Sequence, residues 1–187
     1  MKKHILLVLL FTFQLINAQK ECDYSTNVTD SIGTYKSTKS VLMHQRNFGG
    51  NEKSIYFSLI NSDGLQSLNV QIIQKSNDFS PASCFDERSR VYFQLASGKI
   101  ISLVSVNESN CGSSLILENK NCRVLNGYFI FIAGTTEELK KDSITLMRIK
   151  YATETLDYIV KDELVSDSDQ SIQKPSTYFV DYIKCID

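Results

Sequence analysis

The stretch SIYFSLINSDGLQSLNVQI, residues 54–72, contains the clearest structural signal in the sequence. Apolar and polar residues alternate on both sides of Asp63-Gly64, a dipeptide that is typical of a two-residue β-hairpin turn. Folding the stretch at that turn brings apolar residues opposite each other: Ile55 with Ile72, Phe57 with Val70, and Leu59 with Leu68. Such pairs specify a single register, so the stretch predicts an antiparallel hairpin with one buried face.

Other short apolar runs extend this pattern along the chain. Further strands are predicted at 37–46, 90–95, 99–106, 114–117, 127–133 and 143–151. Parallel strands would need long helices between them, and the sequence lacks helical patterns of that length. The sequence therefore predicts a mainly β fold, an antiparallel sandwich or open barrel of about eight short strands with a C-terminal helix.

The helical signals follow residue 134. Thr135 and Glu138 have the spacing of a capping box, which predicts one short helical turn. Pro175 suits the first position of the C-terminal helix. The apolar face of that helix comprises Tyr178, Phe179, Tyr182, Ile183 and Ile186. Residues 156–165 fit either a helix or a strand, and the polar residues 167–174 predict a mobile loop.

Two registers are open for the strand that precedes the central hairpin. A two-residue turn at Gly49-Gly50 places His44 opposite Ile55, facing the core. A register shifted by one residue instead turns Val41 and Met43 inward and leaves His44 outside. The apolar pattern favours the shifted register.

The first 18 residues have the order of a secretory signal peptide. Lys2 and Lys3 precede an apolar run that is too short to span a bilayer of about 30 Å, and the small residue Ala18 follows. The segment resembles signal peptides of bacterial exported proteins. We predict a signal peptide over 1–18, a single β-rich domain over 19–187, and a secreted or periplasmic location with no membrane span.

Export into an oxidising compartment permits disulfides. Folding the chain at Ser97-Gly98 brings Cys84 opposite Cys111, within the distance that a disulfide requires. Cys22 and Cys185 lie near the two ends of the domain, and domain termini are often close in space. These two pairs are the candidate disulfides. The fifth cysteine, Cys122, is the candidate free thiol.

Composition excludes several classes of function. Without Lys2 and Lys3 the chain has 18 basic and 21 acidic residues, a net charge of −3, whereas nucleic-acid binders are strongly basic. His44 is the one histidine after the predicted signal peptide, so one chain cannot form a multi-histidine zinc site. The sequence has no Cys-x-x-Cys motif and no Gly-rich phosphate loop, and no cofactor or metal is expected.

Three pairs of adjacent carboxylates occur, at Asp86-Glu87, Glu137-Glu138 and Asp162-Glu163. Glycosidases use two acids, but neighbouring strand residues point to opposite faces, so solvated surface charge is the simpler interpretation. Tyr56 and Tyr92 fall on the face opposite the apolar one. They could contact a partner, although the pattern favours their being covered by a second sheet or by the helix.

Together these features predict an exported, disulfide-stabilised, non-enzymatic binding or structural module. Its partner would be a protein, a glycan or a small apolar ligand, with no role for nucleic acid. The alternative is an extracellular hydrolase that uses carboxylates to cleave a glycan or another polymer.

Overall fold

The structure is a computed structural model that describes residues 21–78 and 82–187. The predicted signal peptide lies outside the described residues. One antiparallel sheet of eleven strands dominates the described part of the chain. Its strands are β1 (Tyr24–Thr29), β2 (Thr34–Thr38), β3 (Val41–Phe48), β4 (Asn51–Ser62), β5 (Leu65–Ser76), β6 (Arg90–Leu95), β7 (Ile100–Ser105), β8 (Ser113–Leu117), β9 (Lys120–Phe131), β10 (Ile144–Lys150) and β11 (Thr155–Ile159).

The remaining elements are short. β12 (Leu164–Val165) and β13 (Ile172–Gln173) form a separate hairpin, and α2 (Thr135–Leu139) precedes β10. The C-terminal helix α3 (Tyr178–Tyr182) is flanked by the 3-10 turns η2 (Pro175–Thr177) and η3 (Ile183–Ile186). The mainly antiparallel β fold with a C-terminal helix is therefore as predicted.

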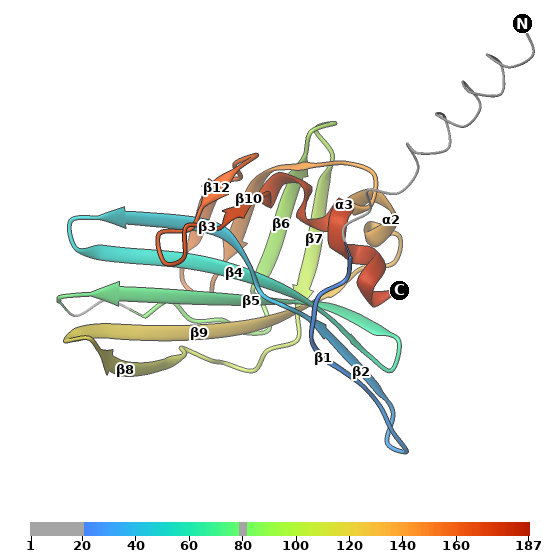
Figure 1. Cartoon of the computed structure of the whole chain (residues 1–187), viewed down its shortest axis with the longest axis horizontal. Helices are drawn as coiled ribbons and strands as arrows, with labels where there is room; N and C mark the ends of the chain where they lie inside the picture. Colours follow the sequence, from blue (N-terminus) through green and yellow to red (C-terminus); the bar gives the residue numbers. More distant parts are fainter. Residues whose placement is uncertain (1–20, 79–81) are drawn as a thin grey trace, which may run out of the picture.

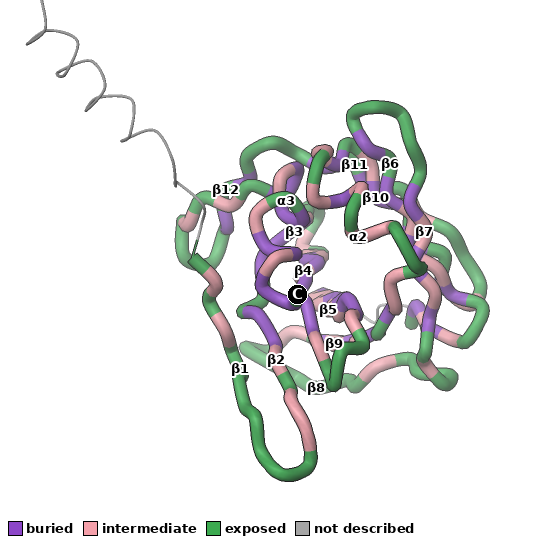
Figure 2. The backbone as a smooth tube through the Cα atoms, turned by 90° about the vertical axis from the view of Figure 1, so that its right-hand side faces the viewer, coloured by how far each residue is buried: buried purple, intermediate pink, exposed green. Residues whose placement is uncertain are grey.

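Three long strands, β4, β5 and β9, form the centre of the sheet, and each of its flanks divides in two (Figure 1). β3 and β2 pair with different halves of β4, and β8 and β7 pair with different halves of β9. Beyond β7 the sheet continues through β6 and β10 to β11. Seen along the long strands, it curls around the C-terminal helix without closing into a barrel (Figure 2).

The predicted central hairpin is present in the predicted register. Ile55 opposes Ile72, Phe57 opposes Val70 and Leu59 opposes Leu68, and all six side chains are buried. Asp63 and Gly64 both have positive φ, 51° and 86°, as the left-handed turn between two twisted strands requires. This buried face is called the inner face here, and the opposite one is the outer face.

The C-terminal helix packs its predicted apolar residues onto the inner face. Phe179 is 1% exposed, and its ring centroid lies 4.9 Å from that of Phe93 and 6.3 Å from that of Phe57. Pro175 occupies the first position of the preceding 3-10 turn, where its missing N–H costs no hydrogen bond. The aromatic cluster joins the two halves of the sheet through one helix.

A β-bulge changes the interpretation of His44. The predicted strand at 37–46 is in fact two strands, and the register of β3 shifts between Leu42 and His44. Val41 therefore opposes Phe57 in one register, while His44 opposes Ile55 in the other. The prediction that His44 lies outside is wrong, because the bulge buries Val41 without turning His44 to the outer face.

Other local predictions also need correction. The turn after β6 has three residues, because Leu95 and Lys99 pair and Gly98, with φ of 86°, closes the turn. The β6–β7 register is therefore one residue from the predicted one. Gly134, not a capping side chain, precedes α2, and the hydroxyl of Thr135 instead donates to Ile132.

Two segments of ambiguous or polar sequence form strands. The stretch 156–165 contains β11 and β12, and part of the expected loop 167–174 is β13, paired with β12. β1 is a polar edge strand without an alternating pattern, and the sequence did not indicate it.

Candidate binding groove

The outer face of β7, β6, β10 and β11 carries three parallel rows of side chains. Directly opposed residues of neighbouring strands lie on the same face and are in reach of one another. The central row is Ser102, Tyr92, Arg148 and Asp157. The rows beside it are Ile100, Gln94, Leu146 and Ile159 on one side, and Val104, Arg90, Lys150 and Thr155 on the other.

Strand alternation explains why these residues face outward. Val91 and Phe93 are fully buried on the inner face, which turns Tyr92 to the outer face. Met147 and Ile149 are buried in the same way and turn Arg148 outward. The apolar core thus aligns the polar rows on the opposite side of the sheet.

The rows border an open groove of about 590 Å³. Tyr92, Leu146 and Ile100 supply apolar surface, and Ile100 is 66% exposed. Arg148 and Lys150 line the same groove and supply hydrogen-bond donors. A mostly apolar groove with a few polar groups is the usual form of a small-ligand site.

Asp157 fixes the guanidinium of Arg148 beside Tyr92. The Nε and Nη2 atoms of Arg148 donate to the two carboxylate oxygens of Asp157 at 2.6 and 2.7 Å. These hydrogen bonds lower the pKa of Asp157 and raise that of Arg148. A bidentate pair holds the arginine in one orientation, so its position next to the tyrosine ring is set before any ligand arrives.

Lys150 has no such partner. Within residues 21–78 and 82–187 its ammonium group makes no hydrogen bond or ion pair, whereas Arg90 next to it donates to the carbonyls of Glu87 and Ser89. Lys150 is therefore the cation of this groove that remains available to an anionic group.

Tyr56, the other tyrosine expected on the outer face, borders a second hollow of about 390 Å³. The helix packs on the inner face and covers neither Tyr56 nor Tyr92, while the loop between β12 and β13 borders the hollow of Tyr56 through Asp167 and Ser168. The expectation that the helix covers these rings is therefore wrong. Both tyrosines are half-buried, and each lines a hollow on the outer face.

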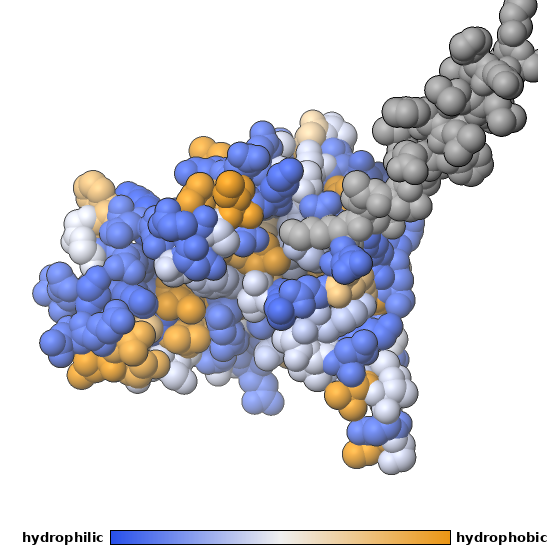
Figure 3. Space-filling view, in the orientation of Figure 1, coloured by the Kyte–Doolittle hydropathy of each residue, from blue (hydrophilic) through white to orange (hydrophobic). Residues whose placement is uncertain are grey.

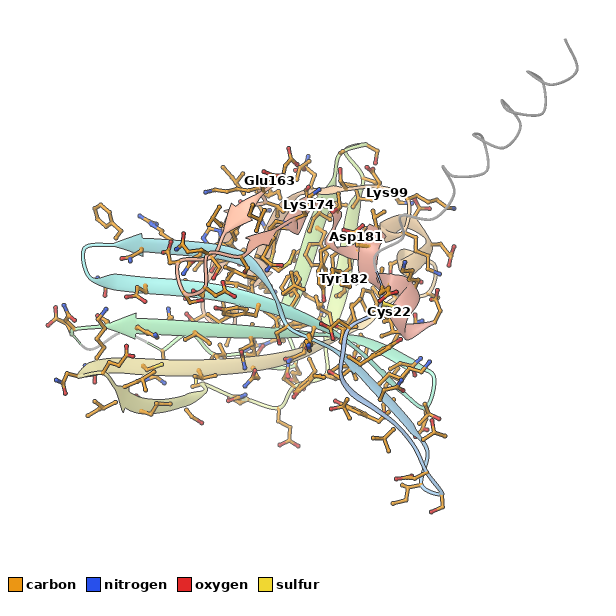
Figure 4. All side chains as sticks on the ribbon, viewed as in Figure 1. Cys22, Lys99, Glu163, Lys174, Asp181 and Tyr182 are labelled. Carbon is orange, nitrogen blue, oxygen red and sulfur yellow. A yellow bond between two sulfur atoms is a disulfide. The ribbon has the colours of Figure 1, made fainter. Side chains whose placement is uncertain are left out.

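The structure brings together the cysteines named from the sequence. Cys84 and Cys111 form one disulfide, and Cys22 and Cys185 form another at the C-terminal helix (Figure 4). Cys122 is free and 3% exposed, opposite Leu115 of β8. Disulfides of this kind fit an oxidising, extracellular environment.

The paired carboxylates lie apart from the groove. Asp86 is in the turn before β6, where desolvation raises its pKa but hydrogen bonds donated to its carboxylate by Ser89 and Arg88 together lower it by more. Glu137 and Glu138 on α2 form ion pairs with Lys140 and Lys99.

The third pair, Asp162-Glu163, is exposed before β12, where Figure 4 shows Glu163 near Lys174. Of the three pairs, Asp86-Glu87 borders a hollow of about 560 Å³ that Glu108 also lines, and the lowered pKa of Asp86 does not suit the proton donor of a glycosidase. Across the described ranges, no group of three or more His, Cys, Asp or Glu side chains is placed to hold a metal ion.

The face of the molecule seen in Figure 3 is mainly hydrophilic. Hydrophobic side chains gather at the tip of β8, where Leu115, Ile116 and Leu117 are exposed. Among the described helices, none is long and apolar enough to cross a membrane.

Comparison of the chain with protein-family models, curated proteins and solved structures finds no match. The groove therefore has to be interpreted from its own residues. Sequence reasoning singled out Tyr92 but missed Arg148 and Lys150. The sequence contained a signal for their outward orientation, since both cations alternate with the apolar residues Met147 and Ile149, which are buried.

Proposed function

We propose that the protein is an exported, non-enzymatic binding module that holds a glycan containing an acidic sugar in the groove on β6 and β10. The observation that carries this proposal is the position of Tyr92, directly opposite Arg148 and one row from the unpaired Lys150. A tyrosine ring offers a flat apolar surface with a polar edge, which suits the apolar face of a sugar ring. The ammonium group of Lys150 and the outer edge of Arg148 suit a carboxylate or sulfate on that sugar.

Export is part of the same proposal. The order of lysines, apolar run and Ala18 over residues 1–18 supports a cleaved signal peptide. The two disulfides support an oxidising compartment, secreted or periplasmic, where extracellular glycans are encountered.

The pKa shifts of the carboxylates favour binding over hydrolysis. A glycosidase needs one carboxyl group whose pKa is raised, so that it can donate a proton near neutral pH. The pKa values of Asp86, Asp142, Asp157 and Asp169 are all shifted downward. These four groups are better suited to structural hydrogen bonds than to acid catalysis.

Glycan-array binding with the secreted protein tests the proposal. We expect acidic glycans to bind and neutral ones of the same length to bind more weakly. Tyr92→Ala and Lys150→Gln should each weaken binding about tenfold, equivalent to about 1.4 kcal/mol. Tyr35→Ala and Lys141→Gln are matched controls, because Tyr35 is exposed on β2 and Lys141 is exposed in the turn after α2.

Two outcomes would contradict the proposal. Equal binding by Tyr92→Ala and the wild type would place the ligand elsewhere. Cleavage of a bound glycan, lost on substitution of a carboxylate, would instead support the extracellular hydrolase.

A further inference from the structure

A second row of polar side chains crosses the inner face, on the opposite side of the sheet from the groove. Arg46, Lys53, Gln74 and Arg123 are directly opposed residues of the adjacent strands β3, β4, β5 and β9. Three of these four residues are cations. Like charges in directly opposed positions repel each other and destabilise a sheet, so the fold alone gives no reason for this row.

Lys53 is held in place by aromatic rings and not by a carboxylate. Its Nζ atom donates to the hydroxyl of Tyr158 at 3.1 Å and lies 5.6 Å from that ring centroid. It lies 5.7 Å from the ring centroid of Tyr151, whose hydroxyl is 3.0 Å from that of Tyr158. Cation–π contacts orient the ammonium group while leaving its charge uncompensated.

The two arginines of the row are also without acidic partners. Arg123 donates to the carbonyl of Cys111, and the guanidinium of Arg46 lies 5.7 Å from the ring centroid of Phe48. Among residues 21–78 and 82–187, no carboxylate lies within 4.0 Å of a charged nitrogen of Arg46, Lys53 or Arg123. The carboxylate of the neighbouring acid Glu52 is paired with Lys120 at 2.8 Å.

His44 experiences the positive potential of the row. It lies two residues before Arg46 on the same strand, with its ring centroid 5.0 Å from that of Tyr158. Burial lowers its pKa, and the charges of Lys53, Lys161 and Arg46 lower it further. The charged groups that lower the pKa of His44 are therefore all cations: Arg46 on β3, Lys53 on β4 and Lys161 after β11.

The row borders a cavity that a ligand can enter. Arg46, Lys53, Gln74 and Lys75 line a hollow of about 310 Å³, together with Glu52, whose carboxylate is paired with Lys120. Phe48 stands at its rim and is 73% exposed, so the hollow is open to solvent. One water molecule takes about 30 Å³ in the liquid, so the hollow has the volume of about ten water molecules. That is enough room for a phosphate or sulfate group.

We propose that this cationic row is a binding site for a doubly charged oxyanion group, phosphate or sulfate, with Arg46 and Lys53 as its main ligands. The planar fork of an arginine donates two hydrogen bonds to one oxyanion, and a lysine adds a point charge. Gln74 lies beside Lys53 and supplies a neutral donor. The site does not depend on the groove, because the two lie on opposite faces of the sheet.

The imidazole of His44 provides the readout, because it is the one histidine after residue 18. Inorganic phosphate is titrated into the secreted protein, and the pKa of His44 is followed by NMR with sodium chloride at matched ionic strength as the reference. A bound oxyanion, singly or doubly charged, offsets the nearby cations, so the pKa of His44 should rise saturably with phosphate and not with chloride.

Variants assign the ligands. Arg46→Gln and Lys53→Gln should each weaken phosphate binding at least tenfold, while Lys141→Gln should bind as the wild type does. Lys53→Gln should also raise the pKa of His44 in the absence of phosphate, because it removes a neighbouring positive charge. Arg46→Gln changes a side chain nearer the strand tip, so it tests the site even where Lys53→Gln impairs folding.

The source of the anion is tested with phenyl phosphate. Tighter binding than inorganic phosphate would assign the site to a phosphate ester on a larger molecule, and equal binding would assign it to the free ion. A pKa of His44 that responds equally to phosphate and chloride would overturn the proposal. So would a phosphate response that both variants retain. Glycan binding by the same variants should be unchanged, which separates this site from the groove.

Discussion

Cys22 and Cys185 are joined across 163 positions of the chain, at the corner where β1 meets the C-terminal helix. Tyr24, two residues after Cys22, donates its hydroxyl to the carbonyl of Cys185 at 2.9 Å. The disulfide and the hydrogen bond thus attach a polar edge strand to the helix that fills the curled sheet.

Removing this disulfide should destabilise the protein more than removing the other. The chain-entropy model gives about 5 kcal/mol for a separation of 163 residues and about 3.5 kcal/mol for one of 27. Urea unfolding of Cys22→Ser/Cys185→Ser and of Cys84→Ser/Cys111→Ser measures both values. A larger loss in the second double variant would show that native-state contacts, and not loop closure, dominate.

The secreted protein should begin at Gln19 and contain one free thiol. Intact mass without reductant should be lower by about four hydrogens than that of the reduced chain, because each disulfide removes two. Cys122 is 3% exposed, so it should react with iodoacetamide only after denaturation. Retention of residues 1–18, or alkylation of more than one thiol, would contradict the predicted export and pairing.

Among substitutions in the C-terminal helix, Phe179→Ala should cause the largest loss of stability. Its ring contacts those of Phe57, Phe93, Phe131 and Tyr178, and burying it contributes about 3–5 kcal/mol. The adjacent Val180 is 40% exposed, so Val180→Ala should change stability by less than about 0.5 kcal/mol. Urea unfolding of both variants measures these losses. Similar urea midpoints for Phe179→Ala and Val180→Ala would mean that the helix does not support the sheet.

Stability should fall as pH drops below about 4. Hydrogen bonds from Ser97 and from Arg148 lower the pKa values of Asp142 and Asp157. A carboxyl group whose pKa is lower in the folded state contributes stability above its unfolded pKa and loses it as it is protonated. The urea midpoint should therefore decrease from pH 7 to pH 3, and Asp157→Asn should show a smaller decrease. An equal decrease in that variant would assign the pH dependence to other groups.

Local patterns predicted the fold where neighbours in sequence are neighbours in space. The hairpin at Asp63-Gly64 and the apolar face of the C-terminal helix follow from alternation, turn chemistry and helical spacing. The turn at Ser97-Gly98 differs by one residue, because a glycine with positive φ closes a three-residue turn as readily as a two-residue one. The bulge beside His44 has no comparable sequence signal.

The two candidate sites depend on strand order, which local patterns do not specify. Arg123 lies next to Gln74 because β9 pairs with β5 and not with a strand adjacent in sequence. Tyr92 could be assigned to the outer face, but its neighbour Arg148 comes from a strand that begins at residue 144. Long-range pairing, set by burial of the common core, creates both rows.

The attachment of the C-terminus to one end of β4 has a practical use. The carbonyl of Ile186 accepts a hydrogen bond from Asn61, while Lys53 lies eight residues earlier on the same strand, about 26 Å away. An affinity tag after Asp187 would therefore leave the chain at the far end from the cationic row. Immobilising the protein on a sensor chip by its tail should keep that row accessible to anions in the flowing buffer.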